Sequence, residues 1–375
     1  MRSVGVEEEL LLVDARSGFP QAVAGAVLAA AERQAWEGPG EVTSSHHLEK
    51  ELQKEQLEFA TKPVTRMGEL QEEIRRRRHE AARHAATAGA VVAAIATSPL
   101  PVRPLLNVGK RYEWMGEQFG LTAQEQLTCG CHVHVAVESD EEGVAVLDRI
   151  RPWLSVLTAM SANSPFWQGQ DSGYASYRSR VWNRWPSAGP VDVFGSADRY
   201  HEQVTAMVDT GVLRDRGMIY FDARLSAVYP TVEIRVADVC LDPATPVLLA
   251  ALARGLVETA ARAWRDGRPP ARIGTSLLRL ASWRAGRSGL DGPLLHPETM
   301  RETSPVAAVG ALYQHVRAAL VDHDDDELVR EGIAKLERRG NGAQTQRRLL
   351  RDEGDLARVV TRCAELTTGG EDPQV

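Results

Sequence analysis

The chain has 375 residues, of which 43% are hydrophobic and 25% charged, and its formal net charge is −7. These values are those of an ordinary globular protein, long enough for one large domain or two smaller ones. The negative charge argues against nucleic acid or an anionic membrane as a partner, and no apolar run approaches the ~20 residues of a membrane-spanning helix. The first residues lack the pattern of a signal peptide, so we expect a cytoplasmic protein.

Six segments alternate polar and apolar residues as a half-buried strand does. They cover residues 3–13, 56–61, 90–97, 128–138, 219–227 and 231–238. The last two are joined by only three residues and are predicted to form a hairpin. The helical patterns between strands would also suit a parallel sheet, but the hairpin and the two-faced strands favour a largely antiparallel one.

Apolar residues at helical spacing predict helices between and after these strands. They cover residues 67–88, 144–162, 246–266, 272–285, 304–321, 327–338 and 356–366. We therefore predict a single α+β domain over residues 1–366, with its strands within 1–240 and a mostly helical part at 241–366. One face of the sheet should lie on a helical layer and the other should stay open. Residues 367–375 are predicted to be a disordered tail.

Residues 163–197 show no clear periodicity and are rich in aromatic residues, glycine and arginine. A structureless segment this long inside a compact domain is usually functional or disordered. Four bulky aromatic residues argue against disorder: Phe166, Trp167, Trp182 and Trp185. We predict a loop that covers a substrate.

Two carboxylates of the first strand, Glu7 and Glu9, share one face, whereas Glu8 points the other way or lies at the strand edge. Neighbouring carboxylates repel unless a cation lies between them, and Mg²⁺ prefers oxygen ligands. The alternative is a charged edge strand without a ligand. Glu58, opposite in direction to Leu57 and Phe59, reads by itself as an ordinary solvent-facing glutamate.

The fourth and sixth predicted strands repeat this arrangement. His132 and His134 share a face and could bind a metal or a phosphate, although a lone histidine is more often a satisfied core residue. Glu233 and Arg235 also share a face, either as a simple ion pair or as a metal carboxylate and a phosphate-binding guanidinium.

The joint pattern is more specific than any of its parts. Four strands place ionisable groups on one face and aliphatic residues on the other, which predicts a site for phosphoryl transfer through Mg²⁺. Neither a P-loop nor a dinucleotide-binding glycine motif is present. ATP would therefore be held by metal ions and arginines.

Several segments resemble the type 2 glutamate–cysteine ligases, the YbdK-like carboxylate–amine ligases. The segments are GVEEELLLVD (5–14), CGCHVHV (129–135), SPFWQGQDSGYASYRSRVWNRWP (164–186) and VEIRVADVC (232–240), and, in the C-terminal part, WRAGRSGLDG (283–292) and GNGAQTQRR (340–348). The resemblance spans nearly the whole chain in the expected order. It implies a fold similar to glutamine synthetase and glutamate–cysteine ligase: a curved, largely antiparallel six-stranded sheet with helices on its outer face.

The resemblance also implies roles for single residues. Those at the metal would be Glu7, Glu9, Glu58, His132 and Glu233. Those at the nucleotide would be His132, His134, Arg235 and Arg347, and the catalytic arginines would be Arg235 and Arg178. The implied cofactors are ATP and Mg²⁺, with Mn²⁺ as a substitute, and the implied assembly is a homodimer.

The implied activity is ATP-dependent formation of an amide from an acid and an amine through an acyl phosphate, by default from glutamate and cysteine. A different amine is compatible with the sequence. Two alternatives remain open at this point. One is a phosphotransferase of the same fold class, and the other is a nucleotide-binding protein without turnover. The presence of every acidic position together with His132 and Arg235 argues against the second alternative.

Overall fold

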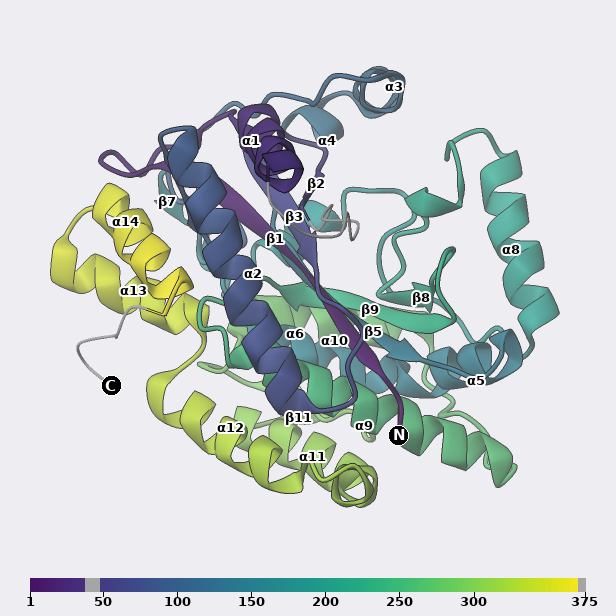
Figure 1. The fold of residues 1–375 in the computed structure, drawn as a ribbon. Coiled ribbons are helices and arrows are strands. Elements are labelled where there is room, and N and C mark those ends of the chain that lie inside the picture. Colours follow the sequence, from purple (N-terminus) through teal and green to yellow (C-terminus); the bar gives the residue numbers. More distant parts are fainter. Residues whose placement is uncertain (38–47, 370–375) are drawn as a thin grey trace.

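The computed structural model describes residues 1–37 and 48–369, and within these ranges a seven-stranded sheet forms the centre of the molecule (Figure 1). Its order in space is β2 (Leu48–Lys50), β3 (Gln56–Ala60), β1 (Val4–Asp14), β5 (Gly130–Ala136), β9 (Thr231–Asp238) and β8 (Ala223–Leu225). The seventh strand, β4 (Ala90–Ala93), pairs with the C-terminal part of β1. All these pairings are antiparallel, as predicted.

All six predicted strands are present, but several are shorter than predicted. The segment predicted as 219–227 keeps only the three residues of β8, and the segment predicted as 90–97 ends at Ala93. The sheet has seven strands, so the predicted number of six was wrong. The strand that was missed is β2, a three-residue edge strand that is too short to show alternation. Two small hairpins lie apart from this sheet: β6 (Phe166–Trp167) with β7 (Gln170–Asp171), and β10 (Leu294–Leu295) with β11 (Glu302–Thr303).

The helices account for most of the remaining chain. Their bounds are α1 (Ala24–Glu37), α2 (Met67–Thr87), α3 (Lys110–Phe119), α4 (Leu121–Gln124), α5 (Asp140–Ile150), α6 (Leu154–Ser161), α7 (Arg178–Trp182), α8 (Ala197–Asp209), α9 (Thr245–Arg265), α10 (Thr275–Ser288), α11 (Pro305–Asp322), α12 (Asp326–Arg339), α13 (Gly342–Glu353) and α14 (Leu356–Thr367). None in the described part of the chain combines the length and apolar character that crossing a bilayer requires.

The helix predicted over 144–162 is interrupted. Between α5 and α6 lies a short 3-10 turn, Arg151–Trp153, which contains Pro152. Proline has no amide hydrogen and its ring clashes with the preceding turn of an α-helix, so the continuous-helix prediction was wrong at this point. The helices α1, α3, α4, α7, α8 and α13 have no counterpart among the predicted elements.

One face of the sheet carries the core. Alternate residues of β1 and β5, including Val4, Val6, Val133 and Val135, are buried in a large apolar cluster. The helices α2, α6, α9 and α14 pack against the strands (Figure 1). The burial of one face leaves the other face of these strands available for polar groups, which is the arrangement predicted from alternation.

Glu8 lies on the core side, opposite in direction to its two neighbours. It is fully buried and makes two hydrogen bonds with the guanidinium of Arg78 in α2, at 2.8 and 2.7 Å. Arg78 also donates to the carbonyls of Cys240, Leu241 and Thr367. Every charge in this pair is therefore compensated inside the core.

The predicted disordered tail begins too early. Thr367 ends α14 and is completely buried, and its Oγ1 accepts a hydrogen bond from the backbone nitrogen of Ala94. Residues 370–375 of the predicted tail lie outside the described residues.

Candidate active site

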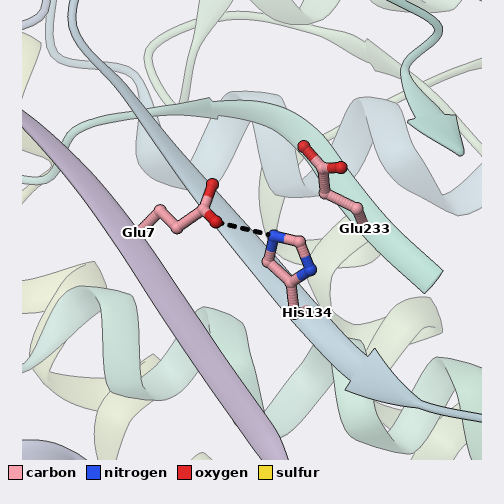
Figure 2. A group of neighbouring side chains, drawn as sticks. All are labelled: Glu7, His134 and Glu233. Carbon is pink, nitrogen blue, oxygen red and sulfur yellow. Dashed lines mark ion pairs between the residues drawn. The ribbon is translucent and has the colours of Figure 1, made fainter. Parts of the chain in front are cut away.

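The strand register places the predicted residues side by side on the open face of the sheet. The pairs directly opposite each other are Glu7 and His132, Glu9 and Glu58, and His134 and Glu233. Figure 2 shows Glu7, His134 and Glu233 pointing toward one another from β1, β5 and β9. Antiparallel pairing of neighbouring strands thus converts four separate sequence patterns into one cluster.

Glu7 lies at the centre of this cluster. One oxygen of its carboxylate is 3.3 Å from Nδ1 of His132. The other is 3.1 Å from Nε2 of His134, the contact that the dashed line in Figure 2 marks. Burial opposes the charged form, but the two imidazoles outweigh it and lower the pKa of Glu7. Burial likewise opposes protonation of His134, yet Glu7 and Glu233 together raise the pKa of that ring.

His132 behaves differently from His134. Burial and the nearby charge of Arg235 lower its pKa to about 4, although Glu7 acts in the other direction. Its ring is therefore neutral at physiological pH, the state in which imidazole binds a metal ion. Among the described residues, Nε2 of His132 has no hydrogen-bond partner even though it is buried.

Acidic side chains gather on the β3 side of the cluster. Burial, together with the charge of Glu51, raises the pKa of Glu9 to about 7, although Arg178 and the amide of Gly130 oppose this. Burial and the carboxylates of Glu51, Glu7 and Glu9 raise the pKa of Glu58 well above its ordinary value. Packing carboxylates this closely is unfavourable unless a cation is shared between them.

These residues fit a divalent cation. Two groups of three residues each bring their ligand atoms within 4.8 Å of one another: Glu7, Glu58 and His132, and Glu7, His134 and Glu233. Carboxylate oxygens with one or two imidazole nitrogens are donors that Mg²⁺ or Mn²⁺ accepts. The unpartnered Nε2 of His132 is a further observation consistent with such a ligand.

Two arginines bring positive charge to the same face. Arg235 forms an ion pair with Glu233, and its guanidinium lies over the rings of Trp182 and Tyr220. Arg178, at the start of α7, also lies over Trp182. Both arginines are buried, and the Nε atom of each lacks a hydrogen-bond partner within the described ranges. Such donors suit an anionic ligand such as a phosphate.

A cleft of about 290 Å³ opens over this face. Its polar lining includes Glu7, Glu9, Glu51, Glu58, His132, Arg224 and Arg235, and its aromatic wall consists of Tyr112, Trp182, Trp185 and Tyr220. The segment 163–197, predicted as a covering loop, contributes the two tryptophans through α7 and the turn that follows it. The segment is partly ordered into β6, β7 and α7 rather than free of secondary structure.

Four further residues at or beside this cluster were not predicted as part of the site. Glu51 directly follows β2 and lines the cleft, and Arg224 makes two hydrogen bonds with Glu233 at 2.7 and 3.2 Å. The alternation of residues 223–225 could have indicated Arg224, which lies directly opposite Glu233. Gly130 and Asp238 are the other two, and both contact the Arg178 region.

Arg347, predicted to bind the nucleotide, is not brought to this cleft. In α13 it forms a two-point ion pair with Asp171, at 2.9 and 2.7 Å, and donates to the carbonyl of Tyr174. It holds the β6–β7 hairpin against α13. Its role toward a nucleotide stays a prediction that the geometry of the cleft does not support.

Solved structures share this architecture. A bifunctional glutathione synthetase from Pasteurella multocida superposes with a TM-score of 0.69 at 15% identity, covering 98% of this chain and 52% of the other. A glutamate–cysteine ligase from Francisella tularensis, solved with AMP, also gives 0.69 at 12% identity and covers 99% and 90%. At such identities the likeness concerns the fold, which is that of glutamate–cysteine ligases.

Sequence comparisons narrow this class to one family. The profile of glutamate-cysteine ligase family 2 (GCS2) matches residues 3–362. A Streptomyces avermitilis protein named "Putative glutamate--cysteine ligase 2-1" is 62% identical over 369 residues, covering 98% of this chain and 100% of its own length. A Streptomyces coelicolor protein named "Putative glutamate--cysteine ligase 2" is 59% identical over 367 residues, covering 98% and 99%. The chain belongs to glutamate-cysteine ligase family 2 and is an ATP-dependent carboxylate–amine ligase.

Proposed function

We propose that the protein joins a substrate carboxylate to an amine through an acyl phosphate, with glutamate as the acid and cysteine as the amine. One observation carries the proposal: neighbouring strands of the sheet bring acidic and basic side chains to one face, where they line one cleft. These residues are Glu7, Glu9, Glu58, His132, Arg224 and Arg235. The names of the Streptomyces relatives support the choice of substrates. A homodimer in the cytoplasm is part of the same proposal.

In the first step, an oxygen of the substrate carboxylate attacks the γ-phosphorus of ATP. The bond from that phosphorus to the bridging oxygen breaks, and the electron pair leaves with ADP. Arg235 and Arg178 are fixed by packing on Trp182, so their charges are already in place when negative charge spreads over the transferred group. Such preorganised charges favour phosphoryl transfer.

The acidic cluster would hold the metal ion of the reaction. The proposed ligands are Glu7, Glu9, Glu58, His132 and Glu233. When bound, Mg²⁺ or Mn²⁺ supplies positive charge to the phosphate oxygens. His134 keeps the carboxylate of Glu7 oriented through its 3.1 Å contact, and Arg224 does the same for Glu233. These two residues therefore fix the directions of the ligands.

In the second step, the amine nitrogen attacks the carbonyl carbon of the acyl phosphate. The bond from carbon to the phosphate oxygen breaks, phosphate leaves, and the nitrogen loses a proton to give the amide. Hydrolysis competes with this attack, so water must be kept from the intermediate. The aromatic wall formed by Trp182, Trp185 and Tyr220 supplies an apolar boundary on one side of the cleft.

ADP release tests the proposal, measured for a panel of acids combined with amines, with and without Mg²⁺. We expect release that needs acid, amine and metal together and yields an amide in equal amount. A stable phosphorylated acid formed without amine would support a phosphotransferase instead. Nucleotide binding with no turnover for any combination would contradict the proposed reaction.

A further inference from the structure

Asp238, at the end of β9, lies behind Arg178 and is almost completely buried, with 1% of its surface exposed. Its carboxylate accepts three hydrogen bonds from the segment that carries Arg178. The donors are the hydroxyl of Ser176 at 2.8 Å, the hydroxyl of Ser164 at 2.7 Å and the backbone nitrogen of Asn163 at 2.8 Å. One side chain thus binds both ends of the segment 163–176.

The same network reaches the arginine directly. The hydroxyl of Ser164, held by Asp238, accepts a hydrogen bond from the backbone nitrogen of Arg178 at 3.0 Å. At the other end of the side chain, Nη1 of Arg178 is 3.9 Å from the Asp238 carboxylate. Asp238 therefore fixes the backbone from which Arg178 departs and also attracts its guanidinium.

A β-bulge brings Asp238 to this side of the sheet. Val133 faces Ile234, whereas Gly130 faces Asp238, so β9 has one more residue than β5 between these pairs. Strict alternation from Glu233 and Arg235 would have placed residue 237 on the open face. The extra residue moves Asp238 opposite Gly130, where it meets the Arg178 segment. Bulges often redirect a side chain next to a functional site.

Gly130 provides the space that this placement requires. A Cβ atom at position 130 would overlap the guanidinium of Arg178. The amide of Gly130 donates to the Glu9 carboxylate, so the arginine, the glycine and a predicted metal carboxylate are directly adjacent.

We propose that Asp238 is a positioning residue that places the Arg178 guanidinium against the acidic cluster and acts on catalysis only through Arg178. The inference rests on the proposed function for the role of Arg178. It does not require Asp238 to touch a substrate. A carboxylate with a structural role alone would stabilise the fold without affecting catalysis through Arg178. Asp148 is such a carboxylate: it accepts hydrogen bonds from the backbone nitrogens of Phe194 and Gly195, away from the cleft.

A double-mutant cycle tests the proposal. The variants are D238N, R178A, the double variant and the matched pair D148N and D148N/R178A, assayed for kcat and KM in the presence of Mg²⁺. We expect D238N to lower kcat by about a hundred-fold, the size of effect that misplacement by about 1 Å can have. In the R178A background D238N should have no further effect, whereas any effect of D148N should persist there. Losses from D238N and R178A that simply multiply would overturn the proposal.

A structural readout separates this inference from the proposed function. Crystal structures of the wild type and D238N should show the guanidinium over residue 130 in the first and displaced in the second. If D238N does not fold, S176A removes a single donor to the carboxylate and should give a smaller displacement. An unmoved arginine in D238N or S176A would overturn the positioning role, even if ligase activity is found. Absence of turnover in the wild type, with a displaced arginine in D238N, would contradict the proposed function alone.

Discussion

Gly130 lies directly beneath the guanidinium of Arg178, so that a Cβ atom at position 130 would overlap Nη2 of the arginine and lie 3.2 Å from Nε2 of His132. Because Gly130 has no side chain, the guanidinium of Arg178 can approach the sheet backbone next to Glu9 and His132, two residues predicted to bind the metal ion. The backbone here is an ordinary strand, so the requirement for glycine is one of space.

We expect G130A to fold and to lose most of its activity, because the methyl group would displace Arg178 and crowd His132. The loss should be about a hundred-fold in kcat, as for other misplacements of about 1 Å. G310A is the matched control, since a Cβ there meets no atom within 4 Å and alanine favours the helix. Normal kinetics for G130A would show that Arg178 does not need this approach.

Glu7 and Glu8 are neighbours in sequence with opposite roles, which makes E7Q and E8Q a matched pair. E8Q leaves Arg78 buried without its charged partner, and breaking a buried ion pair costs about 3–5 kcal/mol of unfolding free energy. E7Q should unfold much closer to the wild type but should abolish ATP turnover. Denaturant unfolding and ADP release measure the two properties. Activity retained in E7Q would contradict the metal assignment.

A pH dependence of stability is expected from Glu258, away from the cleft. Burial opposes its charged form, but hydrogen bonds from Arg262 and Arg2 outweigh it and lower the pKa of Glu258 to about 2. The pKa of Glu258 is lower in the folded than in the unfolded state, so its ionised carboxylate stabilises the folded state above about pH 5. This contribution to the unfolding free energy disappears as the pH falls toward about 2.

Unfolding free energies of the wild type and E258Q across this pH range measure the effect. The wild type should be the more stable of the two near neutrality, and the difference should shrink in acid. A difference that stays constant from neutral pH to about pH 2 would show that charge at Glu258 is not the cause.

Metal binding should raise the melting temperature. A cation that binds only the folded state stabilises it by mass action, and in this protein it would also relieve the repulsion around Glu58. We expect Mg²⁺ to raise the melting temperature of the wild type and chelation to reverse the shift. The shift should be much smaller in E58Q but preserved in E337Q, which changes an exposed glutamate of α12. An equal shift in all three proteins would place the ion elsewhere.

Alternation made half of this site predictable. Glu7, Glu9, His132, His134, Glu233 and Arg235 lie on regular strands, so a period of two assigns each side chain to a face without knowledge of the fold. The same rule directed Glu8 away from its two neighbours or to the strand edge; the structure shows the first, with Glu8 on the core side, and the identity of its partner, Arg78, depends on how α2 packs. The order and register of the strands depend on how separate segments pair, which the alternation within one segment does not indicate.

The rest of the site depends on departures from regularity. Asp238 reaches the open face through an extra residue in β9. The polar residues of this strand shift from positions 233 and 235 to 238, but such a shift at the end of a segment does not distinguish a bulge from the end of the strand. Gly130 is required by the approach of Arg178 from a distant segment. For Arg347, the resemblance predicts a place at the nucleotide, whereas packing in this structure pairs it with Asp171, so its role toward a nucleotide stays a prediction. Such contacts are fixed by tertiary structure.

The most direct measurement of the central claim follows the substrate's own oxygen. The acid is labelled with the heavy oxygen isotope in its carboxylate, and the inorganic phosphate formed during turnover is analysed by mass spectrometry. If the carboxylate attacks ATP and the amine then displaces phosphate, one labelled oxygen passes from the acid to each phosphate. Amide formation with unlabelled phosphate would contradict an acyl-phosphate route on this sheet face.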